Sequence, residues 1–145
     1  MTVSMFLDGS RGPVIHVVVT DSVADVIAVL SQRRIGCVPV VDADDHELVV
    51  GIFSERDVIY GLSTRGAGML DLPVGEVMTS PAETVEPDMP VLAALSLMTR
   101  RRIRHLPVVK AGRMVGFISI GDLVKSRIDH IEAEADAMRE YIRGA

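Results

Sequence analysis

The chain has 145 residues, of which 48% are apolar, 24% charged and 3% aromatic, and its 15 basic and 20 acidic residues give a net charge of −5. This length suits one compact domain or two small halves that share a core, and it excludes a stand-alone catalytic barrel, which needs about 250 residues. The acidic balance argues against a general nucleic-acid-binding protein, because phosphate contacts usually come with a basic domain.

Hydropathy and cysteine content indicate a soluble protein of the cytoplasm. No apolar run approaches the roughly 20 residues that cross a bilayer, and residues 1–12 lack the pattern of a secretion signal. Cys37 is the only cysteine, so one chain can form neither a disulfide nor a cysteine-based zinc site. We interpret Cys37 as a small core residue rather than a redox switch. The histidines show no ligand spacing, and we expect no metal site.

An internal repeat organises the sequence. Residues 34–41 (RIGCVPVV) and 102–109 (RIRHLPVV) superimpose without a gap at an offset of 68 residues. Downstream, residues 51–57 match residues 116–122. Upstream of each of these two segments, an apolar stripe with i, i+3, i+4, i+7 spacing predicts an amphipathic helix. Its members are Val23, Val26, Ile27 and Leu30 in the first copy and Val91, Ala94, Leu95 and Met98 in the second. The lead-ins also agree, because Val3, Phe6 and Leu7 match Val74, Val77 and Met78.

The sequence pattern of each copy predicts a short strand, a helix, a strand, a turn, a strand and a second helix, in this order. The expected strands of the first copy are residues 17–20, 37–41 and 48–53. Those of the second copy are residues 84–85, 106–109 and 114–118. We expect Asp21 or Ser22 to cap the first helix, and Asp88 to cap its counterpart with Pro90 in the first turn.

The connections and boundaries complete this organisation. The turn 42–47 is acidic but lacks the spacing and glycine of a calcium loop, so we interpret it as solvated. Residues 61–73 show no periodicity and predict a linker or surface loop. The expected units are a first repeat at 2–62, a linker at 63–73, a second repeat at 74–128 and a C-terminal helix at 129–145. Because one copy buries little core alone, we expect a pseudo-twofold α+β domain with two equivalent clefts.

Two Ser-x-x-Asp tetrads are the most informative polar motif. Ser54 to Asp57 and Ser119 to Asp122 each follow a strand directly and open a helix. A serine cap with an acid three residues later is an ordinary helix start. A carboxylate at the end of a strand can equally accept both hydroxyls of a ribose, while free helix N–H groups favour an anion.

The repeated helix, the Arg-Ile-x-x-x-Pro-Val-Val strand and the Gly-apolar-apolar-Ser-x-x-Asp motif resemble a tandem pair of cystathionine-β-synthase (CBS) domains, called a Bateman module. The resemblance covers residues 2–125. Residues 98–109 and 119–125 are similar to those of small stand-alone bacterial CBS-pair proteins and plant organellar relatives. It implies that the clefts between the repeats bind an adenosine-containing ligand: AMP, ADP, ATP, S-adenosylmethionine or NAD(H).

The resemblance also assigns roles to individual positions. The ribose-binding residues would be Ser54, Asp57, Ser119 and Asp122. The adenine would lie against Ile15, Ile35 and Phe117 in one cleft, and against Ile52, Ala82 and Ile103 in the other, although all six could simply be core residues. The phosphate would meet Arg104 and His105, helped by Arg56. The first copy has Gly36 and Cys37 where the second has Arg104 and His105, so we expect the two clefts to differ.

Residues 98–127 hold eight basic residues and one acid. We interpret Arg100 and Arg101 as a solvated helix end rather than a nucleic-acid site, because no aromatic residues interleave the charges. The C-terminal segment repeats apolar residues in alternating steps of four and three: Val124, Ile128, Ile131, Ala135, Met138 and Ile142. This stripe predicts a helix that packs back over the module or forms a dimer seam, and the resemblance favours a homodimer.

The predicted function is a non-enzymatic sensor whose ligand changes the arrangement of the two copies and signals to a separate, unknown effector protein. A ligand-free dimerising adaptor is the main alternative. An enzyme, either a nucleotide hydrolase or a regulatory fragment related to inosine-monophosphate dehydrogenase, is the weaker one, because the sequence has no P-loop, nucleophile-base pair or GxGxxG motif.

Overall fold

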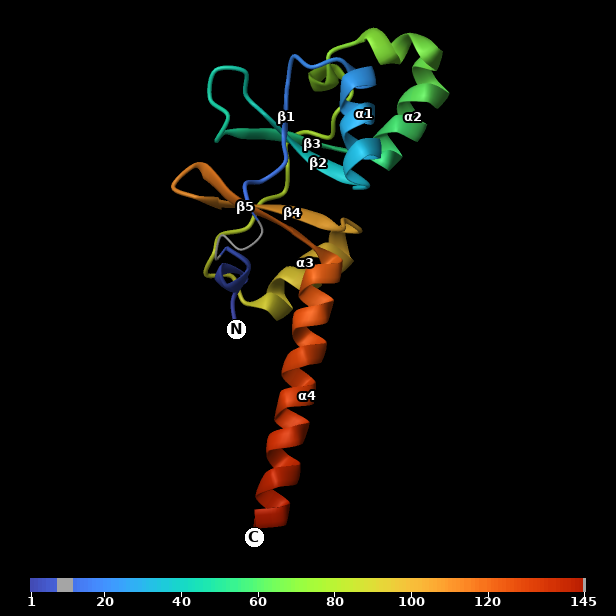
Figure 1. Ribbon diagram of the computed structural model, residues 1–145. Coiled ribbons are helices and arrows are strands. Elements are labelled where there is room, and N and C mark those ends of the chain that lie inside the picture. The colour runs from blue at the N-terminus through green and yellow to red at the C-terminus, as the bar shows by residue number, and fades with distance from the viewer. Residues whose placement is uncertain (8–11, 145) are drawn as a thin grey trace.

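Two small sheets form the centre of the molecule, and each carries the helices of its own repeat (Figure 1). The computed structural model describes residues 1–7 and 12–144. The first repeat contains β1 (Val17–Val18), α1 (Val23–Arg33), β2 (Cys37–Val41), β3 (Val49–Ser54) and α2 (Glu55–Arg65). The second contains α3 (Val91–Arg101), β4 (His105–Lys110), β5 (Arg113–Ser119) and α4 (Ile120–Gly144). Three 3-10 turns are η1 (Val3–Phe6), η2 (Gly66–Asp71) and η3 (Val74–Glu76). The α+β class is as predicted.

The two antiparallel hairpins have the same register. Pro39 pairs with Ile52 in the first repeat, and Pro107 pairs with Phe117 in the second. Each ladder shifts register directly after the valine that follows its proline, Val40 or Val108, so even the irregularity is repeated. The repeat in the sequence is therefore a repeat in backbone geometry.

The strand that precedes each first helix differs between the copies. β1 pairs in parallel with β2 through Val17 with Val40 and Val18 with Val41. The predicted strand at residues 84–85 is reduced to a single parallel bridge between Val85 and Val108, the pair equivalent to Val17 and Val40. The prediction of a short strand is therefore correct for the first copy, whereas in the second copy only Val85 pairs with the sheet.

The helix starts also differ. Ser22 caps α1 by accepting a hydrogen bond from the Asp25 backbone N–H at 3.1 Å, as predicted. The prediction of Asp88 as the second cap is wrong, since α3 begins after Pro90 without a side-chain cap. The Met1 carbonyl accepts the Val91 N–H at 3.2 Å instead, so distant backbone takes the role of a cap.

Residues 63–73 are largely structured, which corrects the expectation of a linker or surface loop. α2 extends to Arg65, η2 follows, and Met69 is completely buried against the first repeat. Gly61 on α2 lies so close to the Met69 side chain that a Cβ at position 61 would clash with its sulfur. The segment thus supplies core to the first repeat.

The two lead-ins cross over between the repeats. The N-terminal lead-in packs into the core of the second repeat, where the Val3 N–H donates to the Met89 carbonyl at 2.9 Å. The lead-in at residues 74–78 packs into the core of the first repeat, where the Val74 N–H donates to the Asp21 carbonyl at 2.7 Å. Each core is therefore completed by chain that comes from outside its own helices and strands.

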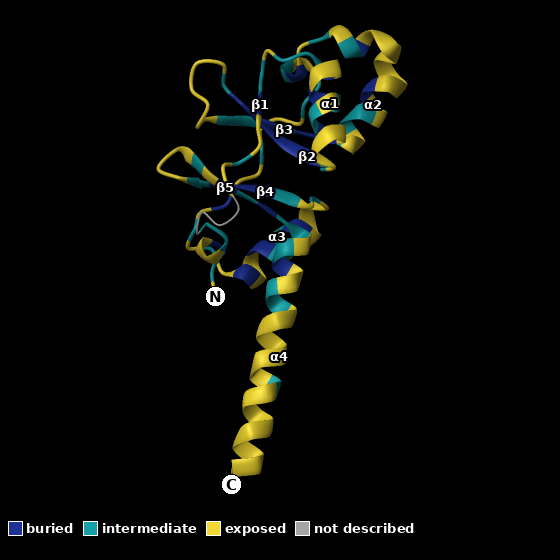
Figure 2. Cartoon of the chain, in the orientation of Figure 1, coloured by how far each residue is buried: buried dark blue, intermediate teal, exposed yellow. Residues whose placement is uncertain are grey.

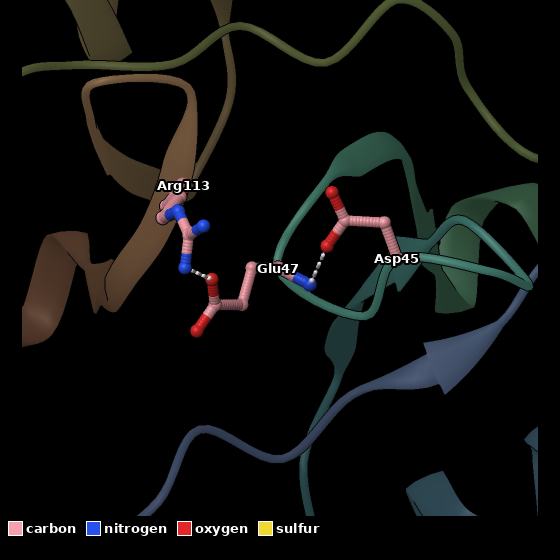
Figure 3. A network of polar contacts seen from close by, with 3 residues as sticks. All are labelled: Asp45, Glu47 and Arg113. Carbon is pink, nitrogen blue, oxygen red and sulfur yellow. Dashed lines mark hydrogen bonds and ion pairs between the residues drawn. The ribbon is translucent and has the colours of Figure 1, made fainter.

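The hairpin tips of the two repeats meet at one edge of the molecule (Figure 3). The Arg113 guanidinium contacts the Glu47 carboxylate, and the Met114 N–H donates to the Glu47 carbonyl at 2.8 Å. Residues 43–47 of the acidic turn are exposed, and the half-buried Asp42 carboxylate accepts the backbone N–H groups of Asp44 and Asp45. Such an Asx turn fits the predicted solvated turn.

α4 leaves the module as a single continuous helix, and most of it is exposed (Figure 2). It contains the predicted C-terminal helix up to Gly144, while position 145 lies outside the described residues. In the described part of the chain, no helix is long and apolar enough to cross a membrane.

Candidate functional site

A cavity of about 380 Å³ lies where the N-terminal lead-in, β2 and the second repeat meet. Its lining residues from the lead-in are Phe6, Leu7 and residues 12–15, and those from the first repeat are Ile35, Cys37 and Pro39. The second repeat contributes His105, residues 115–117, Ser119 and Asp122. The cavity therefore needs both repeats and the crossed lead-in.

Ser119 and Asp122 stand at the junction of β5 and α4. The Ser119 N–H donates to Asp122 Oδ2 at 3.0 Å, and the Asp122 N–H donates to Ser119 Oγ at 3.1 Å. This reciprocal pair is a capping box, the ordinary interpretation of the tetrad. Both side chains are only half-buried and line the cavity. The cap and part of the cavity wall thus coincide at the same two residues.

The three apolar residues expected near Asp122 all line this cavity. Ile15 comes from the lead-in, Ile35 from the end of the α1–β2 connection and Phe117 from β5. Ile15 is 37% exposed, and the other two are half-buried. Partly exposed apolar side chains facing a cavity leave surface for a flat apolar group such as a purine. Their burial is therefore not that of a closed core.

His105 is the one predicted phosphate-binding residue among the lining residues. Its ring packs edge-on against Phe117, with the ring centroids 5.4 Å apart. Burial lowers the pKa of His105 below its usual 6.5, the Asp122 charge opposes this shift, and the Arg104 charge adds to it. The imidazole is therefore mainly neutral at pH 7, and it offers a hydrogen bond rather than a full positive charge.

The structure does not bring Arg104 and Arg56 into this lining. Both side chains are exposed. Arg104 contributes its backbone carbonyl, which accepts the Ile120 N–H at 2.8 Å and holds the start of α4. The predicted basic cluster is thus reduced to His105 at the cavity wall.

The surroundings of Asp57 differ from those of Asp122. Asp57 Oδ2 accepts hydrogen bonds from the N–H and the hydroxyl of Ser54, at 2.9 and 3.2 Å. Asp57 Oδ1 accepts the Thr79 hydroxyl at 2.9 Å. The backbone of Thr79 pairs with Ile52 through two hydrogen bonds of 2.9 Å, and Ser80 Oγ donates to the Val50 carbonyl. The segment after the second lead-in therefore lies directly on this tetrad.

Ile52, Ala82 and Ile103, predicted near Asp57, are all half-buried. Ile52 pairs with Thr79 along β3, and Ile103 packs against the core of the second repeat. None of the three lines the 380 Å³ cavity. The structure thus places Ile52 beside the first tetrad and Ile103 at the core of the second repeat, apart from the Asp122 site.

Sequence reasoning missed Cys37 and Pro39 as cavity residues. Cys37 aligns with His105 in the repeat, so the alignment itself contained the signal that both belong to one site. Burial, followed by the Asp57 charge, raises the pKa of the Cys37 thiol to about 12. The residue is therefore a neutral thiol at physiological pH, which agrees with its interpretation as a small apolar residue.

The residues described here contain no cluster of three or more His, Cys, Asp or Glu side chains suited to a metal ion.

Comparison with known proteins adds independent information. The family model of the CBS domain matches residues 10–64 and 74–129. The mitochondrial CBS domain-containing protein CBSX3 of Arabidopsis thaliana is 35% identical over 126 residues, which cover 86% of this chain and 61% of that protein. This chain thus spans less than two thirds of the length of that relative.

Two solved structures are similar along most of the chain. A CBS-domain containing protein from Agrobacterium tumefaciens is 36% identical, with a TM-score of 0.79, and the match covers 87% of this chain and 92% of that one. A CBS domain protein from Pyrobaculum aerophilum, complexed with AMP, is 31% identical with a TM-score of 0.74, covering 84% and 89% respectively.

Proposed function

This chain belongs to the CBS-domain family as a tandem pair, and from that premise we propose that it is a regulatory module that binds an adenosine-containing ligand in the Asp122 cavity. The observation that carries the proposal is the convergence of Ser119, Asp122 and three apolar side chains on one cavity. A carboxylate suits ribose hydroxyls, and the apolar walls suit a purine. The Pyrobaculum relative with AMP bound supports this ligand class.

The cavity favours a mononucleoside or mononucleotide over a dinucleotide. Its volume of about 380 Å³ lies near the lower end of the roughly 300–1,000 Å³ typical of small-molecule sites. His105 lines it, and the Arg side chains named above are exposed outside the lining. We therefore rank AMP and S-adenosylmethionine above ADP, ATP and NAD(H), and we propose that Arg104 or Arg56 reaches a phosphate at the mouth.

The signal would pass through α4 and the crossed lead-in. Asp122 lies in the first turn of α4, so a ligand that contacts Asp122 acts directly on the start of a helix of 25 residues. Phe6 and Leu7 of the lead-in line the same cavity. A ligand that prefers one arrangement of these elements shifts the population toward it. We propose that a separate effector protein recognises that arrangement, that the module itself is not an enzyme, and that it works as a homodimer in the cytoplasm.

Isothermal titration of the purified chain with adenosine, AMP, ATP, S-adenosylmethionine and NADH tests the proposal, together with thermal unfolding, since a ligand of the native state raises stability. We expect saturable binding of AMP. Tighter binding of AMP than of adenosine would indicate a phosphate contact. No binding by any of the five, with the chain folded, would contradict the proposal and favour a ligand-free adaptor.

Matched substitutions of the two tetrads locate the ligand. Asp122→Asn is expected to weaken AMP binding about tenfold or more, since hydrogen bonds to a charged group are worth about 1.5–3 kcal/mol. Asp57→Asn makes the same chemical change outside the lining of the Asp122 cavity, and it is expected to leave the affinity within about twofold. Equal losses in both variants would contradict the assignment to one cavity.

A further inference from the structure

α4 carries an apolar stripe that the rest of the described chain leaves uncovered. Its members, called the α4 stripe here, are Val124, Ile128, Ile131, Ala135, Met138 and Ile142. The five large side chains are between 42% and 67% exposed. The steps of four and three place them at the alternating d and a positions of a heptad repeat, beginning with d at Val124. Such a seam is the contact surface of a coiled coil.

The module packs against other faces of the same helix. Leu123 is fully buried, and the Ser126 hydroxyl lies 3.4 Å from the Met1 sulfur and 3.6 Å from the Met5 sulfur. At 100° per residue, Leu123 lies about 100° and Ser126 about 160° around the helix from Val124, so both lie outside the α4 stripe. Beyond these turns α4 extends away from both sheets (Figures 1 and 2). The alternative that the stripe packs back over the module is therefore wrong.

A helix that extends into solvent with an exposed apolar seam is only marginally stable in a single chain. Most helical stability in proteins comes from packing an amphipathic face, and short isolated helices are marginal in water. α4 has 25 residues, about 37 Å at 1.5 Å per residue, and only its first turns contact the module. The remaining turns gain stability only if another surface covers the α4 stripe.

Charges beside the stripe identify the partner and its direction. The e positions hold Lys125, Glu132 and Arg139, and the g positions hold Arg127, Glu134 and Tyr141. In a parallel, in-register pair each g residue faces the e residue five positions later on the other helix. Arg127 then faces Glu132 of the second copy, and Glu134 faces Arg139 of the second copy. Both contacts are attractive, and the twofold symmetry makes each of them twice.

The antiparallel alternative brings like charges together. Matching a to d positions along the whole stripe centres an antiparallel pair near residue 133. Glu132 would then face Glu132, Glu134 would face Glu134, and Lys125 would face Arg139. Within one chain Glu134 contacts His130, and Arg139 contacts Asp136, but all four side chains are at least 43% exposed. Such surface pairs exchange partners readily.

We propose that the α4 stripe pairs with the α4 stripe of a second copy as a parallel, in-register, two-helix coiled coil. This pairing does not depend on ligand binding. It places both modules at the same end of the coiled coil, each with Asp122 at the base of its own α4. The two proposed ligand cavities are thereby connected to one coiled coil.

Cysteine cross-linking of the full chain tests the direction. Met138→Cys lies at a d position, so the parallel pair sets the two thiols within disulfide reach. The antiparallel pair would separate them by ten residues, about 15 Å. Ala137→Cys is the matched control, one residue away and outside the seam. Cys37 is buried, and oxidation of the unaltered chain measures any cross-linking through Cys37. We expect rapid oxidation to a covalent dimer for Met138→Cys and slow oxidation for Ala137→Cys.

Charge reversal tests the register without a cysteine. Glu134→Lys puts like charges at the parallel contact and is expected to weaken dimerisation about tenfold in sedimentation equilibrium. Arg139→Glu in the same chain should restore it. Glu140→Lys, the same charge change at an outer position, is the control and should have little effect.

The unaltered chain should sediment as a dimer of the 15.7 kDa chain. A monomer at tens of micromolar, a trimer, equal cross-linking at positions 137 and 138, or tighter association of Glu134→Lys would each overturn the proposal.

Discussion

Asp57 and Asp122 occupy equivalent places in two repeats whose hairpins share one register, yet their surroundings differ. The Thr79 hydroxyl donates to Asp57, and the chain after the second lead-in lies along β3. Asp122 instead lines a cavity together with Ser119 and residues from three other segments. The tetrad is a helix cap in both places, so a capping motif alone does not tell which carboxylate lines a cavity.

The difference arises at positions outside the tetrads. His105 in the second repeat corresponds to Cys37 in the first, and both line the Asp122 cavity. Duplication supplies two equivalent frameworks, while single substitutions and neighbouring segments give the two tetrads different surroundings. The two repeats therefore provide internal controls for each other.

The largest effect is expected in the two cores. Phe53 and Ile118 are equivalent and fully buried, and each belongs to the core of its own repeat. Phe53→Ala should cost about 3–5 kcal/mol and Ile118→Ala about 2–5 kcal/mol in the free energy of unfolding. Because the lead-ins cross, loosening either repeat frees a segment of the other. Urea unfolding followed by circular dichroism should therefore show one common transition in each variant.

Exposed residues of the same repeats give the controls for this prediction. Ile59 on α2 is 68% exposed and Leu92 on α3 is 56% exposed. Ile59→Ala and Leu92→Ala should change the stability by no more than about 0.5 kcal/mol. Two separate transitions, or hydrogen exchange that accelerates in only the altered repeat, would show that the crossing does not couple them.

An intermediate effect concerns the pH dependence of the free energy of unfolding, and it arises at His105, which stands where the first repeat has Cys37. Burial lowers the pKa of His105 in the folded chain below its usual 6.5, so the unfolded chain binds the proton more readily. The stability contribution is complete above pH 6.5 and falls as the pH drops through 6.5 toward the folded pKa. The free energy of unfolding of His105→Gln should lack this part of the decrease toward low pH. Urea unfolding between about pH 5 and 7.5 measures it. Identical pH profiles for the variant and the unaltered chain would refute it.

The smallest effect is expected at the hairpin tips. Glu47 and Arg113 form an ion pair between the repeats, and both side chains are more than half exposed. A double-mutant cycle with Glu47→Ala and Arg113→Ala should give a coupling of at most about 1 kcal/mol, reduced further by salt. The backbone bond from Met114 to Glu47 remains in every variant. A larger, salt-independent coupling would mean that the tips hold the repeats together.

The sequence by itself determined the repeat, the α+β class, the central hairpins and the start of α1 at Asp21 or Ser22, of which the structure selects Ser22. These features are local, because hydrophobic periodicity and capping act over a few residues. It also singled out Ser119, Asp122, Ile15, Ile35, Phe117 and His105, which the structure brings to one cavity. The repeat made this possible, since two copies of a motif identify equivalent positions without any long-range information.

Only the tertiary structure decided which segment completes which core. Residues 1–7 and 74–78 have similar sequences, so nothing local assigns one to the second repeat and the other to the first. Because of the same crossing, the Met1 carbonyl accepts a hydrogen bond at the start of α3, where the Asp88 side chain was expected to be the cap. It also brings Thr79 to Asp57. Long-range packing selected these contacts, because each core requires apolar side chains that its own helices and strands do not provide.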